Sequence, residues 1–211
     1  MRRLVALLLV FGVMAAGCAD DGSADAPTTS EVEADGGLTD FVLPAESVGS
    51  IAGFEGVVAQ ELGDVQVLEN PDPRGPCGGE SPPPPTQGTA GRSFTGDGLS
   101  IVQVVAEGPE VDAFVAAQLA DIAEPCGPYE SQTSAESTQT VDQIQIVVLP
   151  DDAGFFTTSR VADGAQVVFA GSALVRVDGV TSLVFALGFE PISLTAMESF
   201  ARLVDAELRS R

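Results

Sequence analysis

The chain has 211 residues, of which 9 are basic, 31 are acidic and none is histidine, so its formal net charge is −22. A surface of this sign repels phosphate backbones and anionic lipid headgroups, which argues against nucleic-acid binding and against electrostatic attachment to a membrane. Because the chain has no histidine, Ser-His-Asp catalysis, Cys-His catalysis and HExxH zinc sites are excluded. It also has no lysine, which excludes Walker A loops and SxxK sites.

The first 17 residues have the layout of a secretory signal peptide that ends just before a cysteine. A basic start is followed by an apolar run of about 13 residues and a small-residue stretch, with Cys18 next. A helix that spans a bilayer needs roughly 20 apolar residues, so we interpret residues 1–17 as a cleaved segment and not as an uncleaved membrane helix. The pattern is similar to a bacterial lipobox, although Ala15 stands where leucine is usual. It predicts a lipoprotein with acyl chains such as palmitate on Cys18; simple secretion without a lipid is the alternative.

Residues 18–37 are small and acidic and contain almost no large apolar side chain. They cannot bury enough surface to offset the entropy of ordering, so we predict a flexible acidic tether. We therefore expect a protein held at the extracytoplasmic face of the cell membrane by its lipid, because its charge cannot hold it there.

Residues 38–211 are long enough for one domain with a substantial core. In its first part the sequence predicts a short helix at residues 44–52 and a strand at 57–68. A proline-rich loop follows at 70–87, and a strand hairpin at 92–95 and 99–107. Gly96-Asp97-Gly98 is a strong turn signal for the hairpin. The prolines at 82–85 favour a polyproline II segment, which can dock into an aromatic groove, but we interpret them as a rigid loop.

An amphipathic helix is predicted between Gly108-Pro109 and Pro125, which places Cys126 at its exit. Its core-facing stripe consists of Val111, Phe114, Val115, Gln118, Leu119 and Ile122. Cys77 and Cys126 are an even pair once Cys18 is lipidated, so outside the cell we predict a disulfide. They lie 49 positions apart, and closing such a loop removes about 4 kcal/mol of unfolded-chain entropy. No CxxC pair and no histidine is present, so a metal site is poorly supported.

The last part of the domain predicts a surface loop, a run of strands and a closing helix. The polar residues 131–140 form the loop, and the strands are residues 141–149, 155–161, 166–177 and 180–189. Asp178-Gly179 predicts a tight hairpin turn. Thr195 to Glu198 is a capping-box pattern that opens the helix, whose apolar stripe is Met197, Phe200, Ala201, Val204 and Leu208. These elements predict an α+β fold: a twisted antiparallel β-sheet with helices packed mainly on one face, in a single domain.

Several segments together resemble the PknH-like extracellular sensor domain family. They are the opening LPAESVGSI, the proline-rich loop with its cysteine, the helix GPEVDAFVAAQLADIAEPCG, and the strand pair around VRVDGVTSLVFA before the closing helix. The resemblance covers about residues 38 to 211 and implies a twisted antiparallel sheet with a cleft for an unidentified ligand. Cys77 and Cys126 match the first disulfide of the family, whereas the family's second bridge, in the later strands, has no cysteines here.

Three arginines are the candidates for holding an anionic ligand in such a cleft: Arg92, Arg160 and Arg176. The alternative for each is an ion pair of little energetic weight. Carboxylate-pair catalysis is the one enzymatic chemistry left, but the adjacent Asp151-Asp152 follows a proline at a predicted turn and is better explained as a solvated turn. We predict no catalytic residue, no metal and no cofactor.

These observations favour a non-enzymatic, membrane-anchored lipoprotein that acts as a ligand-binding or sensor domain. Its ligand is an unknown small molecule or component of the cell envelope, and its output passes through a protein partner. The alternative is an interaction or scaffold protein of the cell envelope without a small ligand.

Overall fold

The computed structural model describes residues 37–61, 74–82, 89–123, 125–134, 137–150 and 153–210. Apart from Gly37, they belong to one compact unit, Leu38–Arg211. The predicted signal peptide, the tether with Cys18, and the Asp151-Asp152 pair lie outside the described residues. Within the described ranges, no helix is both long enough and apolar enough to cross a membrane.

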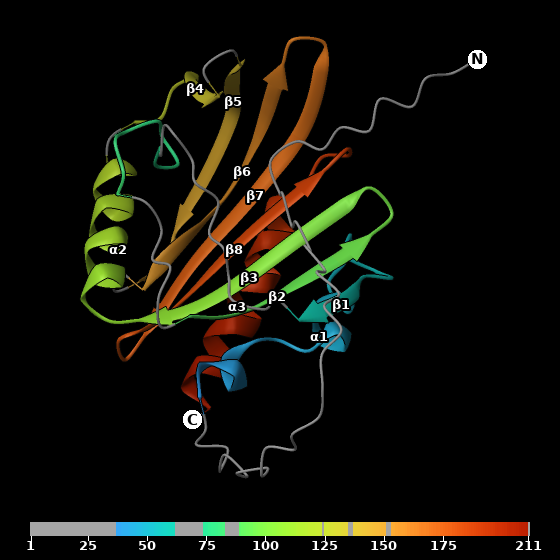
Figure 1. Ribbon diagram of the computed structural model, residues 1–211, viewed down its shortest axis with the longest axis vertical. Coiled ribbons are helices and arrows are strands. Elements are labelled where there is room, and N and C mark those ends of the chain that lie inside the picture. Colours follow the sequence, from blue (N-terminus) through green and yellow to red (C-terminus); the bar gives the residue numbers. More distant parts are fainter. Residues whose placement is uncertain are drawn as a thin grey trace, which may run out of the picture. The chain divides into compact units, whose positions relative to one another are not determined.

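An antiparallel sheet forms the centre of the domain (Figure 1), and the described residues contribute eight strands to it. Its strands are β1 (Val58–Glu61), β2 (Thr89–Gly96), β3 (Leu99–Glu107), β4 (Tyr129–Ser134), β5 (Ser137–Val148), β6 (Gly154–Asp163), β7 (Gln166–Val177) and β8 (Val180–Gly188). Their order across the sheet is β1-β2-β3-β8-β7-β6-β5-β4. The chain therefore leaves the middle of the sheet after β3, restarts at the far edge with β4, and returns strand by strand to β3.

Both hairpins predicted from Asp-Gly turns are present. Gly96 pairs with Leu99 and Val177 pairs with Val180, so each turn has two residues. Asp178 and Gly179 both have positive φ, at 51° and 88°, which is the backbone of the tight turn that an Asp-Gly pair favours.

The polar segment 131–140 is not the loop that we predicted. It forms most of the edge hairpin β4–β5, in which Glu130 pairs with Thr140 and Ser131 with Gln139. The segment has no alternation of apolar and polar side chains and lies at the edge of the sheet, so the hydrophobic pattern could not reveal it.

The helical elements are η1 (Leu38–Phe41), α1 (Ala45–Gly49), α2 (Pro109–Asp121) and α3 (Leu194–Arg209). The residue before α3 is Ser193, whose side chain accepts the Ala196 N–H at 3.0 Å. The prediction that the helix opens at Thr195 is therefore wrong by two positions, because Ser193 already satisfies a free N–H group of the first turn.

The helices lie on both faces of the sheet. Phe200 of α3 packs in one buried cluster with Phe156 and Val175, whereas Phe114 of α2 packs in another with Phe155 and Leu174. Neighbouring residues of a strand point to opposite faces, so α3 and α2 cover opposite sides of β6 and β7. In Figure 1, α3 runs behind the strands and α2 lies at the left of the sheet. The prediction of helices mainly on one face is not confirmed.

A buried glutamine ties the start of the domain to the sheet. Gln103 on β3 has no exposed surface. Its side chain accepts the Leu43 N–H at 2.9 Å and donates to the Phe41 carbonyl at 3.3 Å and the Ser182 hydroxyl at 3.1 Å. Each of these bonds satisfies a polar group that burial would otherwise leave without a partner.

Candidate functional site

An open groove of about 1030 Å³ runs along α3, beside the ends of β5, β6 and β7. Its apolar lining consists of Val147, Val148, Leu149, Pro150, Ala153, Phe156, Val177, Leu194 and Ala201. Val148 lies at the rim with 51% of its surface exposed, and Val147 is 38% exposed. The groove therefore presents apolar surface that the described part of the chain leaves uncovered.

The α3 wall of the groove carries charges of alternating sign. Glu198, Arg202, Asp205 and Arg209 each follow a buried position of α3 by one residue, so they form a stripe beside the packed face. Arg202 donates to Glu198 at 2.7 Å, and Arg209 donates to Asp205 at 2.8 Å. The stripe thus combines two ion pairs with no net charge.

The three arginines proposed from the sequence do not converge on one site. Arg92 donates to the Leu43 carbonyl at 2.8 Å, and Arg160 of β6 pairs with Asp142 of β5 at 2.9 Å. Arg176 is among the residues that line the groove, but its guanidinium pairs with Asp112 of α2 at 2.5 Å. A common role of the three in holding one anion has no geometric support; single roles stay predictions.

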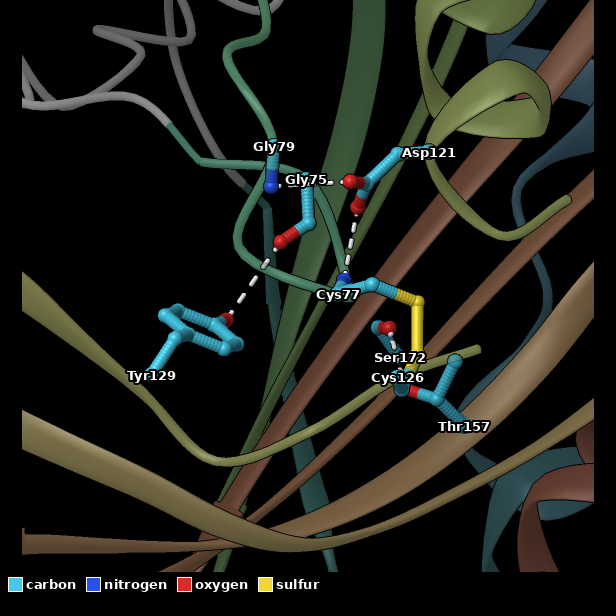
Figure 2. The surroundings of a disulfide bond; sticks show 8 residues. All are labelled: Gly75, Cys77, Gly79, Asp121, Cys126, Tyr129, Thr157 and Ser172. Atoms are coloured by element: carbon cyan, nitrogen blue, oxygen red, sulfur yellow. Dashed lines mark hydrogen bonds between the residues drawn. A yellow bond between two sulfur atoms is a disulfide. The ribbon is translucent and has the colours of Figure 1, made fainter. Parts of the chain in front are cut away.

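The predicted disulfide is present and joins the loop around Cys77 to Cys126, beyond the end of α2 (Figure 2). Asp121, the last residue of α2, reinforces this link. Its carboxylate accepts the backbone N–H of Cys77 at 2.6 Å and that of Gly79 at 2.8 Å. The loop is therefore held to the helix by one covalent bond and two charge-assisted hydrogen bonds.

Glycines in the loop around Cys77 allow Asp121 and Tyr129 to approach its backbone closely. A Cβ atom on Gly75 or on Gly79 would overlap the Asp121 carboxylate, and one on Gly78 would overlap the ring of Tyr129. The sequence pattern predicted the cysteine pair but did not point to Asp121. The glycines on both sides of Cys77 could have indicated that other groups contact the loop backbone closely.

Tyr129, at the start of β4, packs beside the loop that carries Cys77. Its hydroxyl donates to the Gly75 carbonyl at 3.3 Å. The pKa of the Tyr129 phenol is raised from 10.0 to about 12, first by burial and second by the charge of Asp121, while Arg74 acts in the opposite direction. Figure 2 shows Tyr129 and Asp121 approaching the loop from different elements. These contacts hold the loop against α2 and β4.

Among the described residues, no three Cys, Asp or Glu side chains lie close enough together to hold a metal ion. We take the groove beside α3 as the candidate binding site.

Comparisons with known proteins concern the fold. No protein-family model matches the chain, and no curated protein matches its sequence. A solved structure that is similar in fold is the crystal structure of the extracellular domain of PknH from Mycobacterium tuberculosis. The TM-score is 0.54 at 16% sequence identity, and the match covers 81% of this chain and 94% of that domain. The predicted resemblance to PknH-like domains is thus supported at the level of architecture.

Proposed function

We propose that this protein is a lipid-anchored binding domain at the extracytoplasmic face of the cell membrane. It recognises a small molecule or an envelope component in the groove beside α3, catalyses no reaction, and passes its output to a protein partner. The observation that carries the proposal is the groove itself, whose volume of about 1030 Å³ reaches the size of small-molecule sites.

Three further observations support the location. The N-terminal pattern up to Cys18 fits a lipoprotein. The disulfide between Cys77 and Cys126 is stable in an oxidising compartment. The fold is similar to a domain that is extracellular in another protein.

The chemistry of the groove supports binding over catalysis. Its wall carboxylates, Glu198 and Asp205, each accept a hydrogen bond from an arginine. They are seven residues apart on one helix, a rise of about 10.5 Å between their backbone positions, and each is already paired with an arginine. The chain has no histidine or lysine to act as another base.

Native mass spectrometry of protein purified from its own membranes tests both parts of the proposal. We expect a lipid-modified N-terminus at Cys18 and a second, dissociable mass that belongs to the ligand. Val147→Trp narrows the groove and should remove the second mass. Val58→Trp adds the same bulk at a position that is 68% exposed and outside the groove, and should retain it.

The two parts of the proposal fail separately. An unmodified Cys18, or a mature chain that starts elsewhere, refutes the anchor. A chain that never carries a ligand, or one whose ligand persists in the Val147→Trp variant, refutes the groove as the binding site and favours the scaffold alternative.

A further inference from the structure

The groove has an elongated shape and an apolar floor. Its lining residues on α3 run from Leu194 to Arg209, which corresponds to about 22 Å along the helix axis. Val147 and Val148, which are 38% and 51% exposed, supply accessible apolar surface to this floor; Phe156, Val177 and Ala201 also line the groove but are themselves buried. A trough of this form suits an extended apolar chain better than a compact polar metabolite.

Charge sets the groove apart from the rest of the molecule. The chain as a whole carries a net charge of −22, whereas the stripe on α3 alternates Glu198, Arg202, Asp205 and Arg209 and sums to zero. Arg202 and Arg209 are two of the six arginines that the structure describes. The groove is therefore a place where opposite charges stand side by side within an acidic protein.

A ligand that carries a single charge can pair with Arg202 or with Asp205, but not with both. An anion beside Arg202 lies between Glu198 and Asp205, and a cation beside Asp205 lies between Arg202 and Arg209. Arg202 and Asp205 are three residues apart, a rise of about 4.5 Å, so they face the same side of the helix. A ligand head group that carries both a positive and a negative charge can pair with Arg202 and Asp205 at the same time.

The existing ion pairs leave the stripe open to such a ligand. The side chains of Arg202 and Arg209 are 76% and 59% exposed. Pairs of this kind between neighbouring helical turns contribute little to stability in water. An incoming head can therefore replace one partner of a pair without a large loss of folding free energy.

We propose that the ligand of the groove is an amphiphile with an apolar chain and a zwitterionic head that joins a phosphate to an amine. The chain lies on the apolar floor, the phosphate lies beside Arg202, and the amine lies beside Asp205. This inference rests on the proposed function, because it names the ligand class of the same groove.

Four amphiphiles with the same twelve-carbon chain test the inference: dodecylphosphocholine, dodecyl sulfate, dodecyltrimethylammonium and dodecyl maltoside. Each is titrated below its micelle concentration into the mature, disulfide-bonded chain, by calorimetry and by NMR of backbone amides. We expect dodecylphosphocholine to bind at least tenfold more tightly than the other three. Its largest amide shifts should fall at Val147, Val177 and Arg202.

Exchanged charges provide the matched variants. Glu198→Arg combined with Arg202→Glu keeps the net charge and an ion pair within α3, yet it places a second carboxylate one turn before Asp205; we expect a loss of about tenfold for dodecylphosphocholine. Asp142→Arg combined with Arg160→Glu exchanges a pair outside the groove and should leave the affinity unchanged. Arg202→Gln is the milder variant if the exchanged α3 pair lowers the melting temperature.

The outcomes separate this inference from the proposed function. Tightest binding of dodecyltrimethylammonium means that the overall negative charge decides affinity, and equal binding of all four means that the tail alone does; either result overturns the inference. So does tightest binding of dodecyl sulfate, or shifts that map elsewhere. A different ligand class found in the groove after purification from membranes overturns the inference and leaves the proposed function intact.

Discussion

A single methyl group added to the loop at the disulfide tests whether Asp121 holds that loop to α2. The change is Gly79→Ala. A Cβ atom at this position would overlap the Asp121 carboxylate oxygen that accepts the Gly79 N–H. Gly79 has an ordinary backbone conformation, so the substitution introduces a contact problem and no backbone strain.

The expected loss follows from the bonds that the carboxylate must give up. Asp121 accepts two backbone N–H groups, from Cys77 and Gly79. A hydrogen bond to a charged acceptor contributes roughly 1.5–3 kcal/mol, and at this part-buried site water replaces some of it. We expect Gly79→Ala to lower the free energy of unfolding by about 2–3 kcal/mol, and Asp121→Ala to lower it by a similar amount.

The two changes should not add. In the Asp121→Ala background the carboxylate is gone, and the remaining Asp121 Cβ position is 3.6 Å from the added methyl group, an ordinary contact. Gly79→Ala should then change the unfolding free energy by less than about 1 kcal/mol, and alanine can even stabilise by restricting the unfolded chain. The expected coupling is therefore about 2 kcal/mol.

Urea unfolding of the four proteins of this cycle, with the disulfide intact, measures the coupling. Gly127→Ala serves as the control, because no atom lies within 4 Å of the methyl group that it adds. Additive losses in the double variant would refute the reasoning, since they would mean that Gly79 and Asp121 act independently. An equal loss for Gly127→Ala would assign the effect to the loop backbone in general.

Three other changes test separate parts of the structure. As the pH rises, the unfolded chain releases the Tyr129 proton near its pKa of 10 and the folded chain near its pKa of about 12. The stabilisation that depends on this proton is therefore fully present below pH 10, and the free energy of unfolding falls by about 3 kcal/mol between pH 10 and 12. Urea unfolding at pH 9 and 11.5 should show about 2 kcal/mol of this fall in the parent and a much smaller one in Tyr129→Phe. Replacing Cys77 and Cys126 by serine should lower the unfolding free energy by about 4 kcal/mol, and dithiothreitol should lower that of the parent alone. Gln103→Leu leaves the Leu43 N–H buried without an acceptor, so thermal unfolding should report a loss of about 2–4 kcal/mol, whereas a loss below about 1 kcal/mol would show that water reaches this site.

Sequence patterns predicted the elements whose formation depends on local chemistry. The Asp-Gly turns fix the two hairpins, and the apolar stripes of α2 and α3 match their buried faces. The pairing of Cys77 with Cys126 followed from counting thiols in an exported chain.

Features that depend on the arrangement of distant elements escaped the sequence. Nothing in the pattern of α2 or α3 says which face of the sheet each covers, because both faces of β6 and β7 are apolar at these positions. The groove exists only because α3 lies beside the end of β5. Asp121 looked like one more surface acid of a helix, and only the fold brings it to the loop amides.

The order of strands also bears on how the molecule folds. β2 with β3, and β4 to β8, pair with neighbours in the chain, so each of these sets can assemble by short-range zippering. β1 joins β2 across a longer separation, as the pairing of Val58 with Thr95 shows. The two sets meet only at the ladder in which Val104 of β3 faces Leu183 of β8. The chain between β3 and β8 contains α2 and β4 to β7. Because pairing β3 with β8 must bring together segments so far apart in the sequence, we expect this ladder to form slowly. We therefore expect the centre of the finished sheet to be among the last parts of the molecule to form, and the buried cluster that spans both sets to close with it.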